Sequence, residues 1–141
     1  MRVQDVSLRI KLALTKEIEP WLGGADGAWG IRERGKNVVI VDSVYLLKPT
    51  RLKPPPMLIS RCRSEFNGKE HETCTYALLI KTRKTRILEE EARESGFVPT
   101  QAIWLDGKGI PLEKNEVGFQ FSNLERLDKF LKWFRDNIDR R

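Results

Sequence analysis

The sequence is short of the residues that most often carry chemistry. Its 141 residues include one histidine, His71, and two cysteines, Cys62 and Cys74, with no CxxC pair. A hydrolytic triad commonly needs a histidine base, but His71 lies in a polar turn between two glutamates. Glu70, His71, Glu72 and Cys74 could hold a metal ion, yet no second cluster completes a structural zinc site. The sequence therefore predicts no metal and no cofactor.

Long apolar segments are also missing. Runs such as Val38–Val41 are far shorter than the stretch of about 20 residues that spans a membrane. Residues 1–14 carry charges inside their apolar pattern, so they lack the uninterrupted apolar core of a signal peptide. We therefore expect a cytoplasmic protein with no membrane partner. A domain of this size does not need a disulfide, and we expect free thiols unless the strands that carry the two cysteines pair.

The composition indicates one globular unit. A chain of 141 residues has the usual length of a single domain, and 40% hydrophobic with 33% charged residues is too apolar for a disordered chain. No linker divides it, so we expect one domain over residues 1–141. Glutamine and asparagine are scarce while lysine, arginine and glutamate are plentiful, which is a thermophile-like composition.

Apolar residues alternate with polar ones along much of the chain. Val6, Leu8, Ile10, Leu12 and Leu14 alternate strictly, which predicts a strand with one buried face. Further strands are expected at residues 28–34, 37–47, 57–63, 72–82, 100–105, 110–112 and 117–121. Glycine-containing turns at 35–37, 67–68 and 106–109 predict hairpins between neighbours. The pattern predicts an α+β fold with a mainly antiparallel sheet of about six to eight strands.

Two helices complete the expected fold. Residues of about 86–95 are helical in composition, with Thr85 as the expected cap and Gly96 as the end. A C-terminal amphipathic helix is expected over about residues 123–138, because its apolar residues recur at helical spacing. Ser122 and Glu125 have the spacing of a capping box that would open this helix.

The positive charge is concentrated in one third of the chain. The net formal charge is +6, and counting along the sequence gives +1 for residues 1–47, +7 for residues 48–86 and −2 for residues 87–141. Charge that is segregated in this way predicts a one-sided electrostatic field. A polyanion is the natural ligand of such a surface.

Hairpin geometry predicts which cations meet. The proline-rich loop at residues 48–56 follows one strand, and the segment at residues 81–86 ends a later one. If strands 57–63 and 72–82 pair as a hairpin, both segments lie at the same end. Lys48, Arg51, Lys53, Lys81, Arg83, Lys84 and Arg86 can then form one basic edge. Arg61 and Arg63 lie nearer the turn, where Glu70 or Glu72 would partly neutralise them.

These features predict a non-enzymatic nucleic-acid-binding module that uses the basic edge. Tyr45 and Tyr76, with Phe66 nearby, are candidate platforms for stacking bases of a single strand, and Arg61 and Arg63 are candidate additional contacts. No sequence-reading motif is present, so binding to DNA or RNA, single- or double-stranded, is expected to be unspecific. A solvated basic face without a ligand is the alternative explanation of the same charge.

Two other functions fit parts of the sequence. A small regulator, such as a virus-encoded one, could bind a larger machine that handles nucleic acid, RNA polymerase for example, through exposed aromatic side chains. The candidate contacts are Trp21, Trp29, Phe130, Trp133 and Phe134, for which core packing is the simpler explanation. A metal-dependent nuclease would rely on Asp42, Asp106 and Lys108, but aspartate is expected in a glycine turn for backbone reasons alone.

Overall fold

An antiparallel sheet forms the body of the molecule. The computed structural model describes residues 28–33, 37–47, 50–65, 69, 71–105 and 108–139, with the backbone alone for residues 28–33, 105 and 108. Within these ranges a five-stranded sheet has the order β1-β2-β3-β4-β7, and β5 and β6 form a separate hairpin. The strands are β1 (Ala28–Glu33), β2 (Val38–Leu46), β3 (Met57–Glu65), β4 (His71–Lys81), β5 (Ala102–Leu105), β6 (Lys108–Pro111) and β7 (Glu116–Phe121). The predicted α+β fold is confirmed.

Local pairing follows the hairpins that the sequence predicts. β1 pairs with β2, β3 with β4 and β5 with β6, each antiparallel. Every one of these strands begins and ends within two residues of its expected bounds. The pairing of β7 with β4 joins segments that are distant in the chain. The expected strand at residues 6–14 lies outside the described residues.

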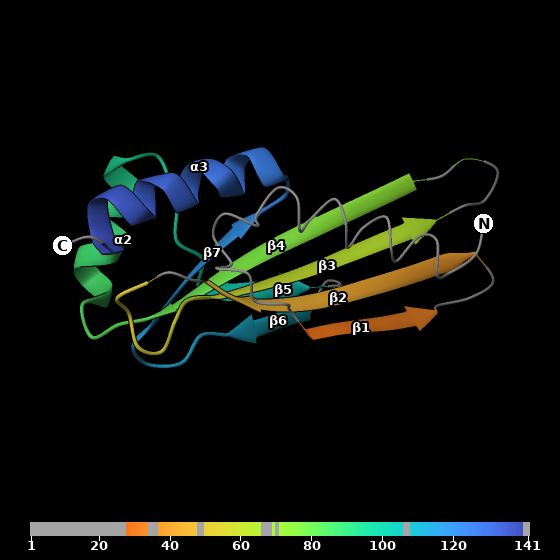
Figure 1. Ribbon diagram of the computed structural model, residues 1–141, viewed down its shortest axis with the longest axis horizontal. Helices are drawn as coiled ribbons and strands as arrows, with labels where there is room; N and C mark the ends of the chain where they lie inside the picture. Colours follow the sequence, from red (N-terminus) through yellow and green to blue (C-terminus); the bar gives the residue numbers. More distant parts are fainter. Residues whose placement is uncertain are drawn as a thin grey trace.

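The sheet buries both of its faces where the helices gather. Leu58, Leu78 and Ile80 belong to the large core cluster that also contains helical residues. Ala77, on the opposite face of β4, packs instead with Ile103 of the β5–β6 hairpin. Figure 1 shows α2 (Thr85–Glu94) and α3 (Leu124–Phe134) at one end of the sheet, with β2, β3 and β4 extending beyond them.

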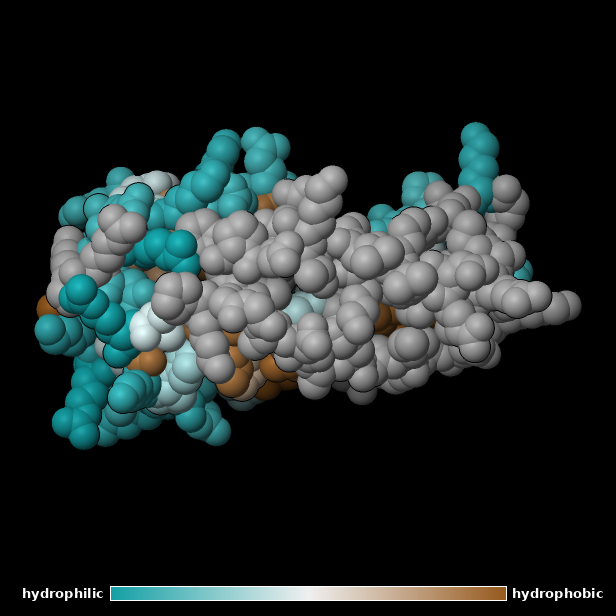
Figure 2. All heavy atoms as spheres, viewed as in Figure 1, coloured by the Kyte–Doolittle hydropathy of each residue, from teal (hydrophilic) through white to brown (hydrophobic). Residues whose placement is uncertain are grey.

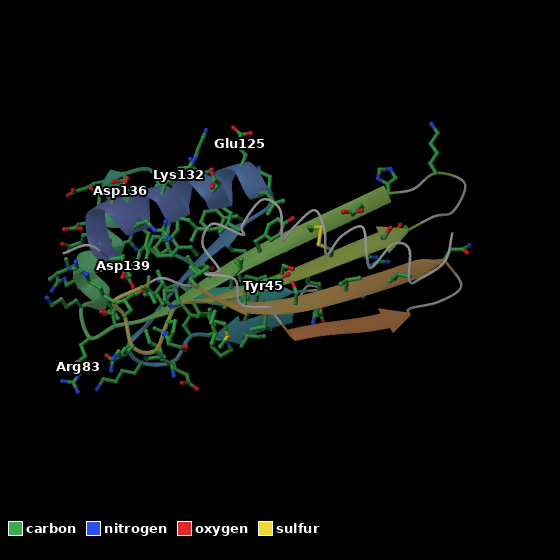
Figure 3. The ribbon with its side chains drawn as sticks, viewed as in Figure 1. Tyr45, Arg83, Glu125, Lys132, Asp136 and Asp139 are labelled. Carbon is green, nitrogen blue, oxygen red and sulfur yellow. A yellow bond between two sulfur atoms is a disulfide. The ribbon has the colours of Figure 1, made fainter. Side chains whose placement is uncertain are left out.

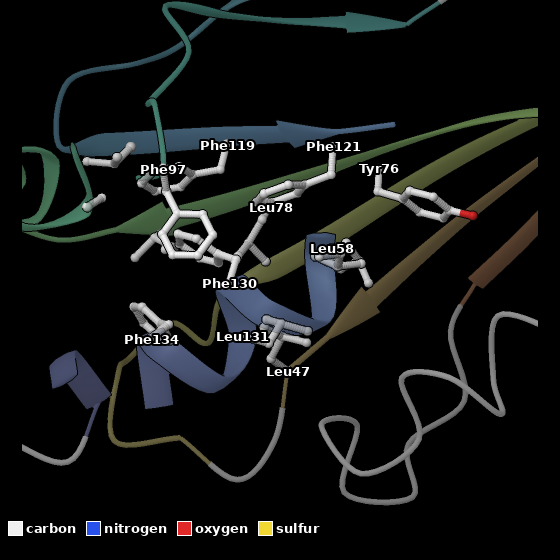
Figure 4. Packing of buried hydrophobic residues seen from close by; sticks show 14 of the residues in the cluster. Leu47, Leu58, Tyr76, Leu78, Phe97, Phe119, Phe121, Phe130, Leu131 and Phe134 are labelled. Carbon is white, nitrogen blue, oxygen red and sulfur yellow. The ribbon is translucent and has the colours of Figure 1, made fainter. Parts of the chain in front are cut away.

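Phe130 of α3 is at the centre of the aromatic core. Its side chain is 0% exposed. The ring centroid lies 4.4 Å from that of Phe119, 5.1 Å from that of Phe97 and 5.5 Å from that of Phe121 (Figure 4). These rings come from α3, β7 and the segment after α2, so Phe130 packs α3 against β7 and against the segment that follows α2.

Both helices begin differently from the expectation. Lys84, and not Thr85, is the N-cap residue of α2, and no side-chain hydrogen bond caps this helix. Asn123, and not Ser122, is the N-cap residue of α3, where its side-chain oxygen accepts a hydrogen bond from the backbone N–H of Arg126 at 2.8 Å. Asparagine and serine are about equally good caps, so composition could not separate the two adjacent positions.

The two helices end in different ways. Gly96 follows α2 with a φ of +88°, a left-handed conformation that glycine adopts without steric cost. It ends the helix, as predicted. α3 continues into a π-helical turn, η1 (Arg135–Asp139). No helix among the described residues is long and apolar enough to cross a membrane.

The two cysteines form a disulfide, so the expectation of free thiols is wrong. Cys62 on β3 is the direct cross-strand partner of Cys74 on β4, and their Cα atoms are 4.1 Å apart. The register of the hairpin brings the two side chains together, which the sequence allowed only as an alternative. The bond joins the central part of β3 to β4.

The proline-rich loop folds back toward the C-terminal turn. The backbone N–H of Leu47 donates to the carbonyl of Pro56 at 2.9 Å, which closes the loop at its base. Thr50 Oγ1 and the backbone N–H of Arg51 both donate to Asp139 Oδ1, each at 2.9 Å. The peptide bond between residues 53 and 54 is cis. The loop is therefore closed at its base and tethered to η1.

Candidate nucleic-acid interface

The β3–β4 hairpin separates two groups of basic residues. Arg63 is opposite Thr73 near the turn of this hairpin. Lys81 lies at the other end, opposite Glu116 of β7. The expected division between Arg61 and Arg63 on one side and the 81–86 segment on the other is therefore present.

Arg61 and Arg63 are engaged by carboxylates. Arg61 donates to both oxygens of Asp42, with Nε–Oδ1 at 2.6 Å and Nη2–Oδ2 at 3.0 Å. Arg63 Nη2 lies 2.7 Å from Glu65 Oε1, a partner that the sequence did not suggest, while Glu70 lies outside the described residues. The bidentate Arg61–Asp42 pair is a strong, charge-assisted one, whereas the Arg63–Glu65 pair is about half exposed and weaker. These two arginines therefore form a patch with carboxylate partners, separate from the basic edge.

Six exposed cations lie at the opposite end of the sheet, and we call this surface the basic end. Its members are Arg51, Lys53, Lys81, Arg83, Lys84 and Arg86, while Lys48 lies outside the described residues. Arg86 Nε lies 3.4 Å from Glu90 Oε1, but both side chains are largely exposed, so this ion pair is weak. Lys53, Lys81, Arg83 and Lys84 make no ion pair with any carboxylate in the described ranges.

The proline-rich loop reaches the 81–86 segment. Leu52 of the loop lines the same groove as Arg83 and Lys84. Figure 3 shows Arg83 pointing outward from the end of the molecule where Asp139 also lies. The tether between the loop and Asp139 holds Leu52 toward this end. The loop that carries Arg51 and Lys53 and the segment that carries Arg83 and Lys84 therefore border the same groove, although they are about thirty positions apart in the chain.

The groove at the basic end has mainly aliphatic walls. Its volume is about 430 Å³, and β4, α2, η1 and the proline-rich loop all contribute side chains. The lining residues are Leu52, Ile80, Thr82, Arg83, Lys84, Ile87, Leu88 and Ile138. Figure 2 shows hydrophilic residues over this end of the molecule with hydrophobic atoms between them. Among the residues that the structure describes, no acidic side chain lines the groove.

The first turn of α2 adds positive potential to the basic end. Its N-cap residue, Lys84, provides no side-chain hydrogen bond, and no acidic residue lies in the first turn. The N–H groups at the start of a helix point away from it and favour a negative charge. Arg83, Lys84 and Arg86 surround this turn in the sequence, so the helix dipole and the side chains act in the same direction.

Both expected stacking tyrosines are buried, so they cannot serve as platforms for bases. Tyr45 is 3% exposed and Tyr76 is 5% exposed, because each occupies an inward position of its strand (Figure 4 shows Tyr76). Burial, followed by the nearby charge of Glu72, raises the pKa of Tyr76 to about 12. Phe66, also considered for stacking, lies outside the described residues.

The aromatic residues proposed for partner binding mostly belong to the core. Phe130 and Phe134 are 0% and 4% exposed, which confirms core packing for both and removes them from any docking surface. Trp133 is half-buried against Phe97 and Phe130. Trp21 lies outside the described residues, as does the side chain of Trp29.

Trp104 is an exposed aromatic residue that sequence reasoning missed. It is 54% exposed, and a Cβ atom added at Gly109 would stand 2.9 Å from its Cη2. The ring therefore lies across the glycine of the neighbouring strand. Period-two alternation was a usable signal, because a buried Ile103 places the next side chain on the outer face.

Of the residues considered for a nuclease, the structure describes the side chain of Asp42 alone. Asp42 is held by Arg61, which accounts for its position on a central strand. Asp106 and the side chain of Lys108 lie outside the described residues. His71 is exposed. Among the described residues no group of three or more histidine, cysteine, aspartate or glutamate side chains is placed to hold a metal ion.

Comparison with known proteins adds no relative. No family model, no curated protein and no solved structure matches this chain. Function must therefore be inferred from the surface chemistry of the chain itself.

Proposed function

We propose that this protein is a non-enzymatic nucleic-acid-binding module, located in the cytoplasm, whose basic end contacts the phosphate backbone. The observation that carries the proposal is the shared groove of Leu52, Arg83 and Lys84. It brings the proline-rich loop and the 81–86 segment to one surface, so cations from both can contact a single strand. Each phosphate that they neutralise releases condensed counterions, which drives binding.

The start of α2 supports this choice of ligand. Phosphate groups bind at helix N-termini because several N–H groups and the helix dipole face the same point. Here that turn carries no acidic residue and is surrounded by arginine and lysine. A phosphate at this position would meet both fixed dipoles and mobile charges.

The binding is expected to be independent of sequence. Contacts to phosphate position a protein on its ligand but do not read bases. Beyond its first turn α2 carries Glu89, Glu90, Glu91 and Glu94, and these charges would repel the walls of a major groove. α2 is therefore not a recognition helix, and the cations around it act as backbone contacts.

The test is the salt dependence of binding. A variant with Lys53, Arg83 and Lys84 changed to alanine is compared with a control that loses Arg93, Lys129 and Lys132. The control removes the same charge from cations that already face Glu89, Glu125 and Asp128. Fluorescence anisotropy with a labelled oligonucleotide gives the slope of log K against log salt.

The basic-end variant should lower the steepness of this slope by about 2 to 3, since each lost phosphate contact contributes about 0.7 to 0.9. The control should change the slope much less. Equal slopes for the two variants would show that net charge alone, and not the basic end, governs binding.

A second candidate function is a regulator that binds a protein machine such as RNA polymerase. The observation that favours it is Trp104, which is half-exposed and has its backbone held by the side-chain amide of Gln120 at 2.9 and 2.8 Å. A rigid exposed tryptophan is a typical interface anchor. Capture of purified polymerase after nuclease treatment, lost on Trp104→Ala, would support this function.

A further inference from the structure

The groove at the basic end contains more apolar surface than phosphate binding can use. Ile87 is 50% exposed, Leu52 and Ile138 are partly buried, and the buried Ile80 and Leu88 complete the aliphatic lining. Exposed aliphatic surface of this kind contributes favourable free energy to binding only when an apolar group of the ligand covers it. The cations account for a charged ligand but leave this surface unexplained.

We propose that the groove holds one unstacked base of a single-stranded nucleic acid, while the cations around it hold the neighbouring phosphates. This inference rests on the proposed function and specifies its ligand. The aliphatic walls and the surrounding cations are then parts of one site for a nucleotide.

The size and chemistry of the groove suit a base. A volume of about 430 Å³ falls within the usual range for small-ligand sites, which are mostly apolar with a few polar groups. Thr82 supplies such a group. Its Oγ1 accepts a hydrogen bond from the Lys84 N–H at 3.1 Å, which leaves its hydroxyl hydrogen able to donate to a base.

The charges extend beyond the groove on more than one segment. Arg83 and Lys84 line the groove, whereas Lys53 and Lys81 are exposed but do not line it. A strand with a phosphate at every nucleotide can place one base in the groove and still reach the outlying cations. A short acidic peptide with an aliphatic side chain would match the groove but would leave these outer charges unused.

A duplex should bind less well than a single strand at this site. Its bases are paired and stacked, and unstacking one costs a few kcal/mol. A single strand offers a free base without that cost. The ligand class that the groove selects is therefore single-stranded DNA or RNA.

The experiment compares ligands that carry the same number of phosphates. An oligothymidine, an abasic oligonucleotide of equal length and a duplex of half that length are titrated against the protein by fluorescence anisotropy at low salt. The variant is Ile87→Asn, which makes the exposed wall of the groove polar. The control is Val98→Asn, because Val98 is 77% exposed and does not line the groove. Thermal unfolding of both variants checks that the fold is retained.

The wild-type protein should bind oligothymidine about 10-fold more tightly than the abasic strand, a difference of about one power of ten in Kd. Ile87→Asn should abolish this difference while leaving the abasic strand bound, and Val98→Asn should keep it. Equal binding of the two strands by the wild type, with a steep salt slope, would overturn the groove assignment and leave phosphate binding intact.

Two other results would also contradict the inference. Loss of salt-dependent binding for every ligand would refute the proposed function together with it. The other result uses an acidic peptide rich in leucine as a competitor. If this peptide displaces labelled oligothymidine at a lower concentration than unlabelled oligothymidine does, and only when Ile87 is intact, the groove would be assigned to a protein ligand.

Discussion

Tyr76 shows how a strand position decides the chemistry of a side chain. Its place on β4 points the ring into the core, where it is 5% exposed, and burial raises its pKa from 10.0 to about 12. An expectation based on the neighbouring basic residues placed this ring on the surface. The burial of Tyr76 was readable in part from the alternation of β4, since Leu78 and Ile80 share its parity.

A titration of Tyr76 follows from this environment. In a Tyr45→Phe variant Tyr76 is the sole tyrosine of the chain, and its phenolate absorbance should appear near pH 12 and not near pH 10. The unfolded chain ionises its tyrosine near pH 10. Stability from this residue is therefore complete below pH 10 and is lost as the pH rises toward 12. A midpoint near 10 in the folded protein would show that Tyr76 is accessible to water.

An ion pair explains why Asp42 and Arg61, two charged residues, lie on central strands. Asp42 is bound by Arg61 with two hydrogen bonds, which removes one carboxylate from a nuclease site and one cation from the nucleic-acid surface. Sequence could identify both residues as charged strand positions. It could not show that they pair, because their pairing depends on the β2–β3 register, which sets Asp42 directly opposite Arg61 and is not visible in the sequence.

The N-cap of α3 can be located by mutation. Asn123→Ala should destabilise the protein by about 1 kcal/mol, because the Arg126 N–H loses its acceptor. Ser122→Ala is the matched control and should change the free energy of unfolding by less than about 0.5 kcal/mol. Urea unfolding measures both. If Ser122→Ala lowered the free energy of unfolding more than Asn123→Ala does, Ser122 would be the cap, as the capping-box pattern in the sequence indicates.

The β3–β4 hairpin depends on its disulfide. Cys62 and Cys74 are separated by 12 residues, and a disulfide that closes a loop of this size contributes about 3 kcal/mol in the chain-entropy description. Reductant should therefore lower the urea midpoint of the wild-type protein toward that of a variant with both cysteines changed to alanine. The double variant itself should not respond to reductant. An unchanged wild-type midpoint would indicate that the thiols are free.

Most elements were predictable because their signals are local. Period-two alternation and glycine turns located β1 to β6, and helical spacing with Gly96 located α2. The position of β7 beside β4 was not predictable, because it depends on contacts between segments nearly forty residues apart. The same limit applies to the tether between Thr50 and Asp139, which are 89 positions apart in the chain.

The distribution of charge over the whole molecule is the feature on which function depends. A sequence count places the excess charge in residues 48–86, and hairpin topology places much of it at one end of the sheet. The structure adds the groove, which the sequence could not indicate because Ile138 of η1 and Leu52 of the loop meet only in the folded chain. It also shows that Arg61 and Arg63 each have a carboxylate partner, Asp42 and Glu65, at the other end of the sheet.

Mapping of amide chemical shifts shows which end of the sheet contacts nucleic acid. A single-stranded oligonucleotide is added to nitrogen-15-labelled protein at low salt, and the resonances that move are assigned. We expect shifts at Arg51, Leu52 and Lys53 and at residues 82–88, fading together as salt increases. Shifts confined to the other end of the sheet, around Arg61–Glu65 and His71–Thr75, would contradict this expectation.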